Sequence, residues 1–162
     1  MQVEFDWTNP EKVWRVIHQW VRENAPKIIR INGLGYGWEP WLQADLADFM
    51  QQNTNARIRR ETLVYGDDRR MDLTMWKNDG GPLTNYFEFK CRSEKMTPTG
   101  LAQGLQNDFA KAKTITEDRK DTRAWIMGFN VEDASEKNLE LKGWTSKSID
   151  GIRVVYKTDI EV

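Results

Sequence analysis

The sequence is short of the two residue types that most often bind transition metals. It contains one cysteine, Cys91, and one histidine, His18, in 162 residues. A single cysteine excludes an internal disulfide and a cysteine-based zinc cluster, and a single histidine excludes a multi-histidine metal site and disfavours a Ser-His triad. We interpret Cys91 as a small buried hydrophobe and His18 as a structural residue. Chemistry in this chain would therefore depend on carboxylates, lysine and a hard cation that prefers oxygen ligands.

Long apolar runs and a secretory leader are also missing. No stretch approaches the roughly 20 apolar residues of a membrane-spanning helix, and the opening Met-Gln-Val-Glu-Phe-Asp lacks the pattern of a signal peptide. With 39% hydrophobic and 30% charged residues, the composition is typical of a globular protein. The length fits a single domain over residues 1–162. We therefore expect a cytoplasmic protein without a membrane partner.

The charge of the chain is nearly balanced, but it is unevenly distributed. The net charge of −1 argues against a protein that coats nucleic acid indiscriminately. Between Arg57 and Lys113 there are eleven basic and eight acidic residues, whereas between Val131 and Val162 there are five and seven. The basic excess in the middle of the chain suits a substrate that carries phosphates.

Hydrophobic periodicity and turn residues predict an α/β domain. The first helix begins near Pro10 and is expected to end at Asn24-Ala25-Pro26, with a short strand or a turn from Lys27 to Ile31. A second helix is expected at about 38–51. Three strands follow at about 58–65, 71–76 and 86–91, and then a helix at about 99–113. A strand buried on both faces is expected at 123–131, a polar helical or irregular stretch at 135–144 and a last strand at 152–156.

The strand that reads Tyr-Phe-Glu-Phe-Lys at 86–90 has polar residues at alternate positions. Side chains two apart on a strand share a face, so Glu88 and Lys90 point the same way and the two phenylalanines point into the opposite layer. Apolar residues bound the segment, which indicates a central strand. Charges drawn toward a core need each other or a metal, because an unpaired buried charge is costly.

Asp72 stands out on the preceding strand because both of its neighbours are apolar. The linker Lys-Asn-Asp-Gly-Gly-Pro at 77–82 lets the two strands fold back as neighbours. Asp72, Glu88 and Lys90 would then converge on one surface, which is the minimum set for holding a divalent cation and activating a water. A solvated strand face, on which Glu and Lys are common, is the ordinary alternative.

Glu39 lies in the first turn of the second helix, in line with its apolar stripe. A carboxylate at that position points inward at the helix N-terminus, where the helix dipole favours it. A role in a site and a plain first-turn role are equally open.

The order of these elements, with Asp72 on the second strand and Glu-x-Lys on the third, resembles the PD-(D/E)XK nuclease superfamily. The similarity covers roughly Trp38 to Val131, and Met71 stands where the name-giving proline would be, which many members also lack. The resemblance implies a restriction-endonuclease-like core, in which helices flank a central mixed β-sheet in the order α-βββ-α-β. Here an extra N-terminal helix would precede that core.

The resemblance also implies a metal site. Asp72 and Glu88 would bind Mg²⁺, with Mn²⁺ as a substitute, and the backbone carbonyl of Phe89 would be a further ligand. Lys90 would orient or help to deprotonate the attacking water, since a neighbouring metal lowers its pKa. Glu39 would complete the acidic cluster.

Arg70 and Arg92 flank the motif and would hold phosphates, although ordinary solvated arginines fit equally well. The helix that follows, with Gln106, Asp108 and Lys111, is similar to the one that flanks the active site in that family. The expected function is a metal-dependent nuclease that cleaves DNA in preference to RNA, as a homodimer if it makes paired cuts.

Two other functions stay open. The first is a non-catalytic, immunity-type protein on the same fold that binds a toxin or another protein, which the eight tryptophans would suit. In the second, the carboxylate–lysine cluster is a structural ion-pair network in a protein of different function.

Overall fold

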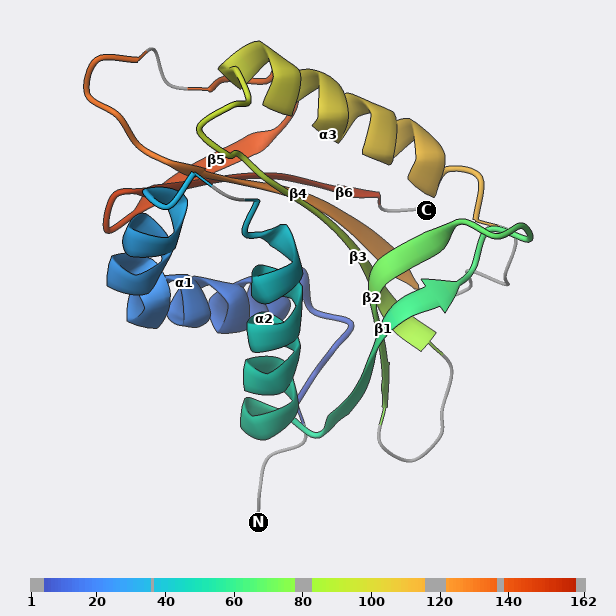
Figure 1. The fold of residues 1–162 in the computed structure, drawn as a ribbon. Helices are drawn as coiled ribbons and strands as arrows, with labels where there is room; N and C mark the ends of the chain where they lie inside the picture. The colour runs from blue at the N-terminus through green and yellow to red at the C-terminus, as the bar shows by residue number, and fades with distance from the viewer. Residues whose placement is uncertain (1–4, 36, 78–82, 116–121, 137–138, 160–162) are drawn as a thin grey trace.

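A computed structural model of the chain describes residues 5–35, 37–77, 83–115, 122–136 and 139–159 (Figure 1). The helices are α1 (Pro10–Asn32), α2 (Glu39–Asn53) and α3 (Pro98–Ala112). The strands are β1 (Ala56–Leu63), β2 (Arg70–Lys77), β3 (Leu83–Cys91), β4 (Arg123–Val131), β5 (Thr145–Ile149) and β6 (Ile152–Asp159).

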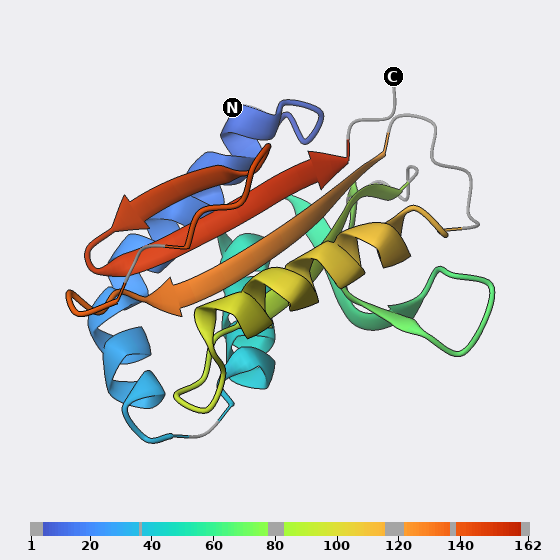
Figure 2. The ribbon, with the colours of Figure 1, turned by 90° about the horizontal axis from the view of Figure 1, so that it is seen from above.

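The strands form one mixed sheet in the order β1-β2-β3-β4-β6-β5. All neighbouring strands are antiparallel except β3 and β4, which are parallel. Parallel neighbours need a long crossover, and α3 lies in that connection. It covers one face of the sheet, while α1 and α2 cover the other (Figures 1 and 2). The prediction of an α/β domain with a mixed sheet flanked by helices is therefore confirmed.

The first helix is longer than predicted. It continues through Pro26 to Asn32, so both the expected end at Asn24-Ala25-Pro26 and the expected strand or turn at 27–31 are wrong. Proline removes only one hydrogen bond of the helix. The apolar face continues beyond it, since Ala25 and Ile28 are both buried in the core. Their burial favours an unbroken helix over an end at the proline.

The C-terminal part contains a strand that the sequence pattern did not reveal. Strand β5 is polar and sits at the edge of the sheet with one buried residue, so it lacks a hydrophobic signal. A tight turn at Asp150-Gly151, where both residues have positive φ, joins it to β6. An Asp-Gly pair between two strands is a strong hairpin signal and would have predicted it. The described residues between 135 and 144 contain no helix.

Two apolar clusters lie on opposite faces of the sheet. The larger, on the side of α1 and α2, is rich in aromatic rings, including Phe87 and Phe89 of β3, and Cys91 is buried there as well. The smaller lies beneath α3. Close packing of α3 depends on Gly128 of β4, because a Cβ at that position would lie 2.6 Å from Leu105 Cδ1. None of the described helices combines the length and apolar character that a bilayer crossing requires.

Candidate functional site

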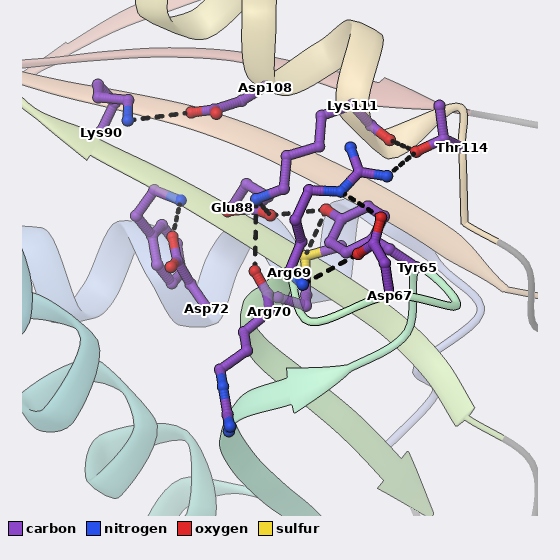
Figure 3. A network of polar contacts seen from close by, with 12 residues as sticks. Tyr65, Asp67, Arg69, Arg70, Asp72, Glu88, Lys90, Asp108, Lys111 and Thr114 are labelled. Carbon is purple, nitrogen blue, oxygen red and sulfur yellow. Dashed lines mark hydrogen bonds and ion pairs between the residues drawn. The ribbon is translucent and has the colours of Figure 1, made fainter.

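Glu88 and Lys90 of β3 both point toward α3, on the face opposite the phenylalanines (Figure 3). Glu88 is only 4% exposed. Its Oε1 accepts hydrogen bonds from the hydroxyl of Tyr65 and from Nζ of Lys111, both at 2.6 Å. A buried carboxylate with two such donors is held firmly in one orientation.

Lys90 is paired with a different residue of α3. Its Nζ lies 3.3 Å from Oδ2 of Asp108, and its aliphatic stem passes over Gly104, where a Cβ would come within 3.2 Å of Lys90 Cε. Burial works to lower the pKa of Lys90, but the carboxylates of Asp108, Glu39 and Asp72 outweigh it and the net shift is upward. Lys90 is therefore an ammonium at neutral pH.

Asp72 lies beside Glu88, where the strand pairing brings it. The pairing of β2 with β3 ends where Leu73 is opposite Phe87, and Asp72 and Glu88 are the next residues of the two strands. The Asp72 carboxylate accepts a hydrogen bond from the Phe89 N–H at 2.7 Å and lies close enough to Glu88 to feel its charge. Of the linker expected at 77–82, Lys77 is the last residue of β2 and residues 78–82 lie outside the described part of the chain.

The environment of Asp72 disfavours its charged form. Burial, and then the negative charge of Glu88, raise the pKa of Asp72 to about 8, against the lowering effect of the Phe89 N–H. A second negative charge beside Glu88 is unfavourable, so the Asp72 carboxyl tends to keep its proton at neutral pH. A cation bound next to Asp72 and Glu88 would therefore be stabilised by their negative charge.

Glu39 lies close to this pair but does not join it. It points inward from the first turn of α2, as expected, and its Oε2 accepts a hydrogen bond from the Cys91 N–H at 3.0 Å. Burial raises the pKa of Glu39, while the Cys91 N–H and Lys90 oppose that shift. In the part of the chain that the structure describes, no three His, Cys, Asp or Glu side chains are grouped to hold a metal.

The two flanking arginines are engaged elsewhere. Arg92 forms a bidentate ion pair with Glu136 and donates to the Met96 carbonyl at 2.8 Å. It lines a hollow of about 440 Å³ whose other charged residues are acidic, namely Glu94, Glu132, Asp133 and Glu136. Arg70 is exposed, and its guanidinium donates to the Glu61 carbonyl, directed away from Glu88 (Figure 3). Neither guanidinium lies against the Asp72–Glu88 pair.

The sequence interpretation gave no role to two residues that contact Glu88. Lys111 lies one turn after Asp108 on α3, so the helix presents an acid to Lys90 and a base to Glu88. That opposite order of charges, at helical spacing, was a readable signal. Tyr65 is the last residue of the strand predicted at 58–65, and nothing in its local sequence links it to a carboxylate 23 residues away.

Comparison of the chain with protein-family models, with curated proteins and with solved structures gives no match in any of the three.

Proposed function

We propose that this protein is a metal-dependent nuclease that hydrolyses phosphodiester bonds, most readily in DNA, on a restriction-endonuclease-like core. The observation that carries the proposal is the Asp72–Glu88 pair, in which Asp72 of β2 is bonded to the Phe89 N–H, directly beside Glu88 of β3, with Lys90 next on the same face as Glu88. Carboxylate oxygens are the ligands that Mg²⁺ and Mn²⁺ prefer. The raised pKa of Asp72 supports the fit, because a cation would offset both its causes, the burial of the carboxylate and then the repulsion from Glu88.

In this proposal Asp72 and Glu88 hold the ion, and the Phe89 carbonyl is a further ligand. Tyr65 and Lys111 both donate to Oε1 of Glu88, so Oε2 retains the capacity to bind a cation. When bound, the ion supplies a water of lowered pKa and offsets the charge that develops on the phosphate.

The remaining groups act on charge and position. Lys90, as an ammonium, would orient the attacking water and attract the scissile phosphate, a role that fits its raised pKa better than proton abstraction does. Glu39 would contribute negative charge near the ion rather than a direct bond, since its Oε2 is already bonded to the Cys91 N–H.

A cleavage assay tests the proposal directly. Labelled duplex DNA, single-stranded DNA and RNA are incubated with the protein in Mg²⁺ or Mn²⁺. We expect cleavage that Lys90→Ala reduces by about 10²-fold or more, the usual size of a lost charge-stabilising group. Lys95→Ala, which removes an exposed lysine that follows β3, is the matched control and should cleave normally. Equal cleavage by Lys90→Ala, or none on any substrate with either metal, would overturn the proposal.

Metal binding provides a second measurement that does not depend on activity. An ion that binds only the folded protein stabilises it by about 2.7 kcal/mol at a hundred times its Kd. We expect Mg²⁺ to raise the melting temperature of the wild type and to have little effect on Asp72→Asn. The exposed Asp68→Asn is the control and should respond as the wild type does.

One observation favours a second candidate, a non-catalytic binding protein on the same fold. Glu88 and Lys90 already have partners of opposite charge in Lys111 and Asp108, so the charges under α3 are mutually satisfied without a metal. A protein of this kind would neither cleave nucleic acid nor be stabilised by Mg²⁺. The two measurements above therefore separate the candidates.

A further inference from the structure

Strand β1, at one edge of the sheet, carries three exposed arginines, Arg57, Arg59 and Arg60. Within the described chain none of them forms an ion pair with a carboxylate. Arg60 donates to Gln43 Oε1 at 3.2 Å, and the Arg59 guanidinium lies 5.6 Å from the centre of the Trp76 ring. No acidic side chain among the described residues therefore neutralises their positive charges.

The strand pairings place two of these arginines on the same face of the sheet as Glu88. Arg59 is opposite Thr74 of β2, and Thr74 is opposite Tyr86 of β3. Opposed residues share a face, as do residues two apart on one strand, so Arg59 and Glu88 share a face. Arg57, two residues before Arg59, does so too.

The usual geometry of β-strands gives the distances from these two arginines to Glu88. Adjacent strands lie about 4.8 Å apart and residues rise about 3.3 Å along a strand, so Arg59 and Arg57 lie roughly 12 and 16 Å from Glu88, backbone to backbone. Helix α3 packs against β3, β4 and β6, and β1 lies beyond the surface that it covers (Figure 2). Both arginines therefore lie on an open part of the face, in line with the candidate site.

We propose that Arg57 and Arg59 form a track for the phosphodiester backbone of a nucleic-acid strand that leads to Glu88. The inference rests on the proposed function and names the surface that would position its substrate. A guanidinium matches phosphate oxygens in a bidentate geometry, and no carboxylate in the described part of the chain has to be displaced first. Contact with the Trp76 ring holds Arg59 in a defined orientation. Two like charges two residues apart on one strand face suit the repeated charges of a phosphate chain.

Fluorescence anisotropy with the full chain in EDTA tests this track without any cleavage. The probes are labelled duplex DNA of two unrelated sequences and a labelled RNA, each titrated at several salt concentrations. The test variant is Arg57→Gln with Arg59→Gln. The control is Arg15→Gln with Arg22→Gln, which removes the same charge from exposed positions of α1, on the other side of the sheet. Thermal melts establish that all variants are folded.

We expect the track variant to bind every probe more weakly, with a slope of log K against log salt that is shallower by about 2, about 1 for each lost phosphate contact. The control should keep the wild-type slope. Equal losses in both variants, an unchanged slope in the track variant, or no binding of any probe by the wild type would overturn the track. Because this binding assay contains no metal, it can support the track even if the wild type does not cleave nucleic acid. It can also overturn the track while cleavage in Mg²⁺ is still observed.

Discussion

On one face of β3, Phe87 and Phe89 pack among aromatic rings between the sheet and the helices α1 and α2. On the other face, Glu88 and Lys90 lie among charged side chains beneath α3. The ring centres of Phe87 and Trp125 are 6.1 Å apart, and Phe89 is 1% exposed. Side chains only one residue apart thus belong to two different environments.

The difference shows which face needs an explanation beyond stability. Burying a large apolar side chain contributes about 1.5–3 kcal/mol. A buried ion pair contributes far less, because desolvation offsets most of the attraction, and apolar replacements are often as stable. Apolar residues on both faces of β3 would therefore be expected to make the fold at least as stable. Retaining Glu88, Lys90 and Asp72 under a helix is understandable if their charges have a function.

The largest expected effect lies on the apolar face. Phe89→Ala would leave a cavity among the rings and lower the free energy of unfolding by about 3–5 kcal/mol, measured by urea denaturation. Leu63→Ala, at a side chain of β1 that is 51% exposed, is the matched control and should change the free energy by no more than about 0.5 kcal/mol. Similar losses in the two variants would remove the basis for treating the apolar face as the source of stability.

On the charged face, Lys111→Met should lower the free energy of unfolding by about 2–3 kcal/mol, because it leaves the buried Glu88 carboxylate without its ammonium. Adding Glu88→Gln removes the uncompensated charge, so the double variant should recover part of the loss. Lys95→Met, at an exposed position, should have little effect. Strictly additive losses in the double variant would mean that the two residues do not interact in solution.

Local periodicity predicted the two faces of β3, since alternation along a strand needs no tertiary information. The positions of Glu88, Lys90 and the phenylalanines follow from that rule alone. Helix α1 was harder, because Pro26 is a strong local signal for an end and the burial of Ala25 and Ile28, which overrides it, is a tertiary effect.

The partners of the site could be predicted only in part, for the same reason. Asp72 was recognisable as a lone acid among apolar residues, and the register of two neighbouring strands brings it to Glu88. Lys111 and Tyr65 reach Glu88 from other elements, and their contacts depend on how α3 docks on the sheet and how the segment after β1 folds back. The order of charges along α3 matches that of Lys90 and Glu88, but it does not show that α3 docks over them, and nothing in the local sequence indicates the contact of Tyr65.

A smaller effect is expected at the hydroxyl that supports Glu88. Tyr65→Phe removes a 2.6 Å hydrogen bond to a carboxylate and should lower the free energy of unfolding by about 1.5 kcal/mol. In a Glu88→Gln background the same change should cost less, because the acceptor is no longer charged. If the loss is the same in both backgrounds, Tyr65 acts through packing and not through Glu88.

The last expected effect is a gradual dependence on pH that belongs to Asp72. Its pKa rises from 3.8 to about 8 on folding, so between these values the folded protein binds more protons at this group than the unfolded chain does. The stability that this group contributes is therefore complete below about pH 4 and is lost as the pH rises to about 8, by no more than about 1.4 kcal/mol per pH unit.

Measured by urea denaturation, the wild type should lose stability relative to Asp72→Asn over this range. The free energies of unfolding of the wild type and of Asp68→Asn, which alters an exposed acid, should change in parallel over this range. Parallel profiles for the wild type and Asp72→Asn would mean that Asp72 ionises beside Glu88 without difficulty. The charged face of β3 would then not differ from the apolar face by an unfavourable buried charge.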